Sequence, residues 1–314
     1  MKKNNISKHR QYKLLKDWPQ LPGDLILGNP TGIGINSDQN LVVFHRAERK
    51  WPADNIIPRV YIPSQTILVI DRKTGKIISG WGEGIFVMPH GLFIDMQNNI
   101  WVTDVGLHQV FKFDSHGKLL MKLGEAFVKG KDSSHFSYPT DIVVISDGSF
   151  YVSDGYGNSR VIKFSPFGEY LFEWGRRGDQ NSEFNLPHAI TLDSHENIYI
   201  ADRENSRIQV FDRAGNFIKK YSGKDFGKMS SVAFRNNSEE FAAVDFVVSG
   251  DKEDKYHSGI LLFDSGGSLI YRLTDDNLEK IGANSWYHNI LIDNDDNLYV
   301  TDIFRNRILK FIPE

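Results

Sequence analysis

Three histidines stand at equivalent places in three similar segments of the sequence, and together they could bind a metal ion. They are His90 in PHGLFI, His188 in PHAITL and His288 in YHNILI, separated by 98 and 100 residues. A lone histidine is more often a structural residue than a ligand. Three imidazoles at one phase of a repeat can instead meet at one point and form an open metal site, with positions left for water or substrate.

These segments belong to a repeat of about 50 residues that occurs six times. The repeats begin at PTGIGI, PHGLFI, PTDIVV, PHAITL, MSSVAF and YHNILI. Turn sequences such as DSHGK and DRAGN, which supply the positive φ of tight hairpins, separate the third and fourth strands of the repeats. The pattern predicts an all-β fold, a six-bladed β-propeller that residues 1–314 form as one domain.

In such a ring the first strand of each blade lines the central channel, so the residue at its start faces the axis. Histidine occupies this position in blades two, four and six. Blades one, three and five have Thr31, Thr140 and Ser230 there. Alternate blades therefore place the three imidazoles about 120° apart around one axis.

Oxygen ligands are also expected close to this axis. The backbone carbonyls of Ile33 and Leu92, together with the side-chain oxygen of Asn289, suit a hard cation such as calcium. Asp141 either contributes a negative charge at the same place or caps a turn. Every strand offers carbonyls, so the pattern indicates this second site less specifically than the histidine site.

The last repeat lacks a fourth strand, because it ends with RILKF (Arg307–Phe311). At the other end of the chain, QYKLLKDW (residues 11–18) is similar to fourth strands such as KLLMKLG. We expect this amino-terminal strand to complete blade six and to remove the open sheet edge. The alternative is a free basic arm.

Two long connections interrupt the repeat. The first, residues 47–65, carries the aromatic residues Trp51 and Tyr61 and is expected to form a lid over a binding site. The second, residues 245–259, is polar and is expected to be a solvated loop.

Composition narrows the range of partners. Lys and Arg number 37 against 40 for Asp and Glu, a net charge of -3, which argues against a nucleic-acid partner and an anionic membrane surface. There is no cysteine, which excludes disulfides and a cysteine zinc site. The sequence shows no signal peptide and no membrane-spanning run, so we expect a cytoplasmic protein without a membrane partner, unless a leader was removed. We also expect a monomer.

Several segments give the chain a resemblance to a known family. FHR (residues 44–46), MPHGL, WVTDVGLHQVFKF, YVSDGYGNSR and ADRENSRIQVF resemble the peptidyl-α-hydroxyglycine α-amidating lyases, which are NHL-type propellers. The resemblance implies a zinc-dependent lyase that cleaves N-acyl- or peptidyl-α-hydroxyglycine to an amide and glyoxylate. It also implies a structural calcium ion.

The resemblance also assigns roles to individual residues. The zinc ligands are His90, His188 and His288, the calcium ligands are Ile33, Leu92 and Asn289, and the catalytic residues are Tyr156, Arg46 and Arg203. The family usually has Asp at position 289 and MPHD where this chain has WYHN (residues 286–289), so both the calcium site and the surroundings of the metal differ. Taken singly, the two arginines could be surface ion pairs and the tyrosine a packed aromatic residue.

Two other functions fit a propeller of this kind. Metal-dependent propellers also hydrolyse lactones and esters, but that chemistry usually relies on carboxylates in the channel, where this chain has His, Thr and Ser. Many NHL-type propellers are non-catalytic scaffolds for protein or RNA. A scaffold has no use for three histidines at one phase of the repeat.

Overall fold

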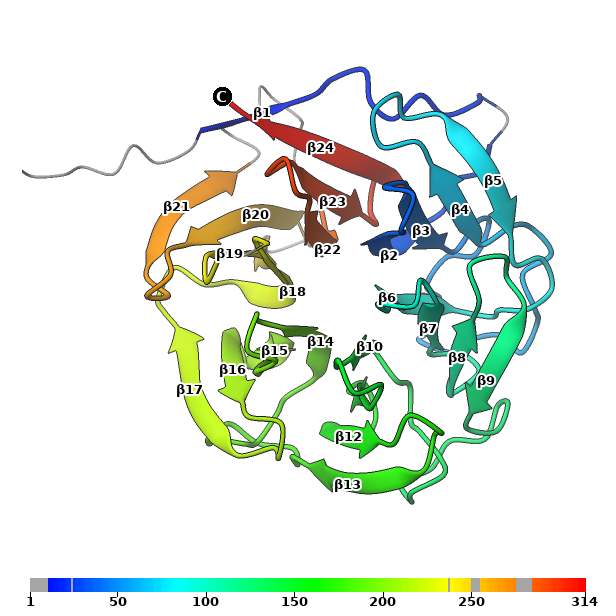
Figure 1. Cartoon of the computed structure of the whole chain (residues 1–314), viewed down its shortest axis with the longest axis vertical. Helices are drawn as coiled ribbons and strands as arrows, with labels where there is room; N and C mark the ends of the chain where they lie inside the picture. Colours follow the sequence, from blue (N-terminus) through cyan, green and yellow to red (C-terminus); the bar gives the residue numbers. More distant parts are fainter. Residues whose placement is uncertain (1–10, 24, 237, 250–254, 275–283) are drawn as a thin grey trace, which may run out of the picture.

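Six four-stranded antiparallel sheets are arranged as blades around a central axis (Figure 1). The computed structural model describes residues 11–314 except 24, 237, 250–254 and 275–283. Within these residues, strands are the regular secondary structure apart from one 3-10 turn, η1 (Arg203–Asn205). The predicted all-β, six-bladed propeller is therefore confirmed.

Each blade runs from an inner strand beside the axis to an outer strand at the rim (Figure 1). The inner strands are β2 (Pro30–Ile35), β6 (Pro89–Ile94), β10 (Asp141–Val144), β14 (Pro187–Leu192), β18 (Lys228–Phe234) and β22 (Tyr287–Ile292). The second strands are β3 (Leu41–His45), β7 (Ile100–Asp104), β11 (Phe150–Asp154), β15 (Ile198–Asp202), β19 (Phe241–Ser249) and β23 (Leu298–Asp302). The third strands are β4 (Ile67–Ile70), β8 (Gln109–Phe113), β12 (Arg160–Phe164), β16 (Arg207–Phe211), β20 (Lys255–Phe263) and β24 (Arg307–Pro313). The outer strands are β5 (Ile77–Trp81), β9 (Leu119–Leu123), β13 (Tyr170–Trp174), β17 (Phe217–Ser222), β21 (Leu269–Thr274) and β1 (Tyr12–Leu14).

The core lies between neighbouring blades. Second strands such as β7 are buried at every residue, as expected for β-branched and aromatic runs packed on both faces. In one cluster, Val42 and Phe44 of blade one pack against Val102 and Phe111 of blade two. Phe86, in the connection that leads into blade two, belongs to the same cluster. The outer strands carry the exposed residues. Packing between neighbouring blades therefore holds the ring together.

The amino-terminal strand closes the ring as predicted. β1 pairs antiparallel with β24, with Tyr12 opposite Pro313 and Leu14 opposite Phe311. The amide of Leu15 extends this ladder by donating to the carbonyl of Lys310 at 2.8 Å. Pairing at this position covers the edge of β24.

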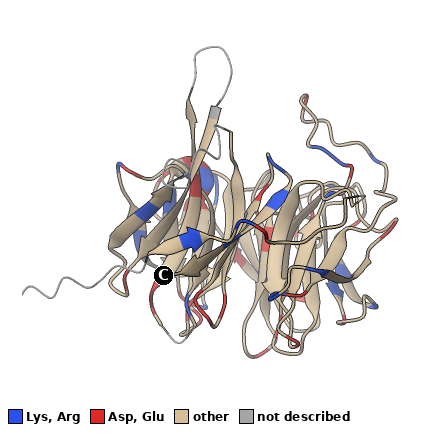
Figure 2. Ribbon diagram, turned by 90° about the horizontal axis from the view of Figure 1, so that it is seen from above, with Lys and Arg blue, Asp and Glu red and all other residues tan. Residues whose placement is uncertain are grey.

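The second long connection differs from the prediction. Residues 250–254 lie outside the described part. Strand β19 continues to Ser249 and strand β20 begins at Lys255, so most of the expected solvated loop is a hairpin. The aromatic and β-branched residues Phe246, Val247 and Val248 favour a strand, which explains the difference. Figure 2 shows this hairpin projecting beyond the ring. None of the described residues forms a helix that could cross a membrane.

Candidate active site

The three predicted histidines meet at the axis of the ring. Each side chain is buried, and their ligand nitrogens all lie within 4.8 Å of one another. The ring centroids of the three pairs are 4.7 to 4.8 Å apart. The propeller thus brings together residues from β6, β14 and β22 that are far apart in the sequence.

Local backbone geometry directs these side chains inward. His188 and His288 are each the extra residue of a β-bulge at the start of their strand, and His90 lies in the corresponding irregularity of β6. A bulge re-aims one side chain without disturbing the rest of the ladder. The next residue, Gly91, lies so close to blade three that a β-carbon on it would be 2.4 Å from the Asp141 carboxylate.

Each imidazole is held by the neighbouring blade. The Nδ1 atoms of His90, His188 and His288 lie 2.6, 2.7 and 2.8 Å from the backbone carbonyls of Thr140, Ser230 and Thr31. A carbonyl can only accept, so each Nδ1 carries the proton and each Nε2 presents a lone pair. The residues that alternate with the histidines therefore orient them, a role that the sequence analysis missed.

Burial keeps these imidazoles neutral. It lowers the pKa of His288 to about 3, with the Arg46 charge as a further cause. Burial also lowers the pKa of His90 and His188 well below the usual value, and the neighbouring histidines add to the effect. Neutral imidazole is the form that binds a metal ion.

The three histidines suit zinc. The Nε2 of His188 is buried and has no hydrogen-bond partner among the described residues, a costly state for a polar atom that nothing binds. Three neutral nitrogens with an open fourth position are a common donor set of catalytic zinc. The residues present thus fit this ion.

Tyr156, Arg46 and Arg203 surround the histidines on one face of the ring, which we call the upper face. This face carries the connections between second and third strands, and each of the three residues follows a second strand. The hydroxyl of Tyr156 lies 3.1 Å from Nε2 of His90, and Nη1 of Arg203 lies 3.5 Å from the same hydroxyl. The structure therefore brings all three predicted catalytic residues to the histidine cluster.

Neither arginine is a simple surface ion pair. Arg46 is buried, donates from Nε to the carbonyl of Pro89 at 3.0 Å, and lies 3.5 Å from the Asn29 side chain. Burial lowers the pKa of its guanidinium to about 10, against the attraction of Tyr156 and Asp104, so the group stays charged at neutral pH. Arg203 pairs with Glu204 while it contacts Tyr156.

The first long connection covers these groups. The Trp51 ring lies 5.5 Å from the ring of Tyr156, and the guanidinium of Arg46 lies 5.3 Å from the Trp51 ring. These residues line an upper-face pocket of about 880 Å³ together with Arg203 and His288. The arrangement is consistent with the predicted lid at Trp51, whereas Tyr61 does not line the pocket.

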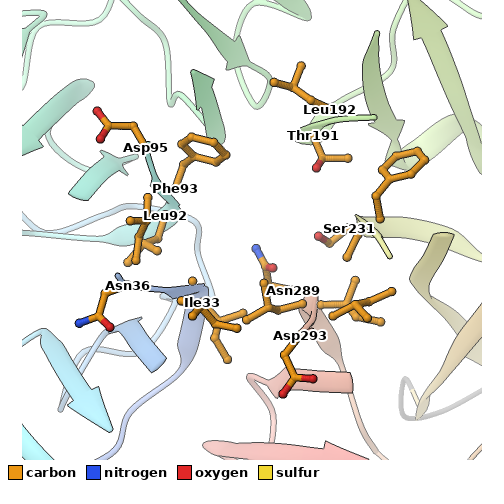
Figure 3. A pocket seen from close by; sticks show the side chains of 18 of the residues that line it. Ile33, Asn36, Leu92, Phe93, Asp95, Thr191, Leu192, Ser231, Asn289 and Asp293 are labelled. Carbon is orange, nitrogen blue, oxygen red and sulfur yellow. The ribbon is translucent and has the colours of Figure 1, made fainter. Parts of the chain in front are cut away.

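The predicted calcium ligands lie at the opposite, lower face. Ile33, Leu92, Asn289 and Asp141 line a pocket of about 500 Å³ there, and Figure 3 shows the Asn289 side chain pointing toward its middle. Asp141 accepts the amides of Ile142 and Ile190 at 2.9 and 3.1 Å, and burial raises its pKa to about 7. Calcium binding here stays a prediction.

Comparisons with known proteins agree with this arrangement. The NHL repeat model matches residues 136–164 and 184–211. "Peptidyl-glycine alpha-amidating monooxygenase B" of Xenopus laevis is 35% identical over 315 residues, covering 95% of this chain and 35% of the relative. "Peptidyl-alpha-hydroxyglycine alpha-amidating lyase 2" of Drosophila melanogaster is 38% identical over 258 residues, covering 76% of this chain and 60% of the relative. The chain thus spans less than two thirds of the length of these relatives.

A solved structure shows the same fold. Virginiamycin B lyase from Staphylococcus aureus superposes with a TM-score of 0.60 over 96% of this chain and 99% of its own. Its sequence identity is 12%, so this likeness concerns architecture alone. The relatives at 31–40% identity and the repeat match carry the assignment instead. The chain is therefore a homologue of the peptidyl-α-hydroxyglycine α-amidating lyases and contains NHL repeats.

Proposed function

We propose that this chain is a lyase that cleaves N-acyl- or peptidyl-α-hydroxyglycine to an amide and glyoxylate. The observation that carries the proposal is the meeting of Tyr156 and Arg203 with the histidine cluster, through the contacts of 3.1 and 3.5 Å at the Tyr156 hydroxyl. Relatives named for this lyase activity add support.

Zinc is part of the proposal. The Nε2 atoms of His90, His188 and His288 would hold the ion, and their neutral state and carbonyl-bound Nδ1 atoms support this role. When bound, zinc supplies Lewis-acid polarisation of a substrate oxygen and stabilises negative charge that develops there.

The residues around the cluster account for the bond changes. Arg46 and Arg203 hold the substrate carboxylate through charge-assisted hydrogen bonds. Tyr156 acts as tyrosinate, with the Arg203 charge beside it, and its oxygen accepts the proton of the substrate hydroxyl. The carbon–oxygen bond becomes the aldehyde of glyoxylate, the carbon–nitrogen bond breaks, and the amide nitrogen keeps the electron pair and receives the proton from Tyr156. Trp51 covers the site and limits access of water.

We also propose a structural calcium ion at the lower face. The carbonyls of Ile33 and Leu92 and the side chain of Asn289 would bind it, supported by their common pocket with the buried Asp141 carboxylate. Asn supplies an oxygen without a charge, so the proposed affinity is lower than with Asp at this position.

The proposal is tested with N-benzoyl-α-hydroxyglycine and zinc-loaded protein. We expect equimolar benzamide and glyoxylate, measured by chromatography and by an aldehyde assay. Zinc-loaded protein that releases no glyoxylate from any N-acyl-α-hydroxyglycine would overturn the lyase assignment. A panel of lactones and esters, incubated in parallel, would reveal the hydrolase alternative.

A further inference from the structure

One wall of the upper-face pocket consists of aromatic rings that the reaction does not use. Trp286 and Tyr256 are stacked with centroids 5.0 Å apart and planes at 15°, and Phe304 lies 4.8 Å from Tyr256. Phe246 supports Trp286 from β19 at 4.3 Å. Phe304 is 47% exposed, although it is a large apolar side chain. We call Trp286, Tyr256 and Phe304 the aromatic wall.

The aromatic wall lies next to the residues assigned to the reaction. The guanidinium of Arg203 lies 5.5 Å from the ring of Tyr156 and 5.8 Å from the ring of Trp286, so it stands between the two. A substrate whose carboxylate pairs with Arg203 therefore lies next to Trp286. The Tyr156 side of the pocket is bounded by Trp51.

The charges of the pocket restrict the group that can lie there. Its described lining contains three cationic side chains, Arg46, Lys50 and Arg203, and no carboxylate. The arginines are assigned to the carboxylate of hydroxyglycine, and a basic acyl group would meet repulsion. The volume of about 880 Å³ exceeds what a two-carbon hydroxyglycine fills, so most of the pocket is left for the acyl part.

Resting on the proposed lyase function, we propose that the aromatic wall binds an aromatic ring in the acyl group of the substrate. Stacking on Trp286 and burial beside Phe304 would favour such a ring over a small aliphatic group. The ring could belong to a benzoyl group or to the side chain of a phenylalanyl residue next to hydroxyglycine. Both sources offer the same apolar, uncharged ring.

The test compares three substrates that differ in the acyl group: N-benzoyl-, N-acetylphenylalanyl- and N-acetyl-α-hydroxyglycine. We expect kcat/KM for at least one aromatic substrate to exceed that of the acetyl substrate by about tenfold or more, equivalent to about 1.4 kcal/mol. The better of the two aromatic substrates identifies the source of the ring. In Trp286→Ala and Phe304→Ala this preference should fall to about threefold or less.

A binding measurement without turnover completes the test. Calorimetry with N-benzoylglycine and N-acetylglycine, which lack the reacting hydroxyl, should show the same preference and the same loss in the two variants. Phe167→Ala is the matched control, because Phe167 is 83% exposed in the turn between β12 and β13 on the lower face. General damage to the fold lowers the rates of all substrates together and leaves their ratio unchanged.

The outcomes separate the two proposals. Equal kcat/KM for all three substrates, with a ratio that Trp286→Ala and Phe304→Ala do not change, contradicts the aromatic subsite and leaves the lyase function intact. Absence of glyoxylate from every substrate contradicts the lyase function itself. Preferential binding of N-benzoylglycine would in that case still support the subsite.

Discussion

At the scale of single residues, neighbouring blades determine the state of each histidine. The carbonyls of Thr31, Thr140 and Ser230 fix the tautomers, and burial lowers the pKa values so that the rings are neutral. Because the partner carbonyl belongs to the next blade each time, the cluster also ties three pairs of blades together. Metal-binding geometry and ring closure therefore depend on the same backbone positions.

The Tyr156 hydroxyl is the group assigned to proton transfer. We predict that Tyr156→Phe lowers kcat by about 10²- to 10⁴-fold, the usual contribution of a positioned acid or base. KM should change little, because the arginines that hold the carboxylate remain. Steady-state kinetics of glyoxylate release measure both constants. Tyr170→Phe, a change on the outer strand β13, serves as the control, and a Tyr156→Phe enzyme with full kcat would remove the tyrosine from the mechanism.

His45 makes stability depend on pH. Burial lowers its pKa to about 4, Nδ1 accepts the amide of Ala47 at 3.1 Å, and Nε2 has no partner among the described residues. The unfolded chain binds a proton near pH 6.5 and the folded chain does not, so this contribution to stability is present above pH 6.5 and is lost as pH falls toward 4. From pH 7 to pH 5 the loss is about 2 kcal/mol.

We therefore predict that His45→Asn, which keeps an acceptor for Ala47, reduces the loss of unfolding free energy between pH 7 and pH 5 by about 2 kcal/mol. Urea titrations of both proteins at the two pH values measure it. All other histidines are common to both proteins, so the difference isolates His45. Equal pH dependence in the two proteins would contradict the assignment.

At the scale of elements, a repeated aspartate organises the upper-face loops. Asp104 at the end of β7 accepts the amides of Val87, Met88, Gly106 and Leu107 at 2.7 to 3.0 Å. The equivalent carboxylates of three other blades accept amides in the same way. Asp154 accepts the amide of Ser137, Asp202 that of Asn185 and Asp302 that of Trp286. Two of these carboxylates, Asp154 and Asp202, thereby hold the connections that carry Tyr156 and Arg203, the residues assigned to the reaction.

The amino-terminal strand supplies a test of ring closure. Tyr12 is buried against blade five, and its hydroxyl lies 3.1 Å from Nη2 of Arg235. We predict that Tyr12→Ala costs about 3 kcal/mol of unfolding free energy, as for other large aromatic residues in a core. Lys13→Ala, an exposed change in the same strand, should stay within about 0.5 kcal/mol. Urea unfolding of the two variants measures the difference, and equal stabilities would show that β1 does not close the ring tightly.

The sequence predicts the features that follow the repeat. Its period gives six blades, its phase selects His90, His188 and His288, and the missing last strand assigns residues 11–18 to blade six. The aromatic wall has no such signal, because Tyr256 lies in the extended strand β20 while Trp286 and Phe304 lie in connections, and only the fold brings the three together. The hairpin of β19 and β20 is misread for the same reason, since it departs from the repeat.

At the scale of the whole molecule, we assign different tasks to the two faces of the ring. The upper face holds the residues assigned to the reaction, and the lower face holds the proposed calcium site around the same axis. A second group of possible ligands, Asp193, His195 and Glu239, also has atoms within 4.8 Å of one another. The His195 side chain is 71% exposed, and Asp193 accepts the amides of its own turn, so this group is a suitable control for metal binding.

The most direct test of the account is a zinc titration of tag-free, chelator-stripped protein, followed by the rate of glyoxylate release. We predict a rate that rises to a plateau at about one zinc per chain. His188→Ala should lose both the bound zinc and the activity while its circular dichroism spectrum stays that of a folded propeller, and His195→Ala should behave as the unmodified protein. Full activity without metal, or a fully zinc-loaded protein that releases no glyoxylate, would contradict the central claim.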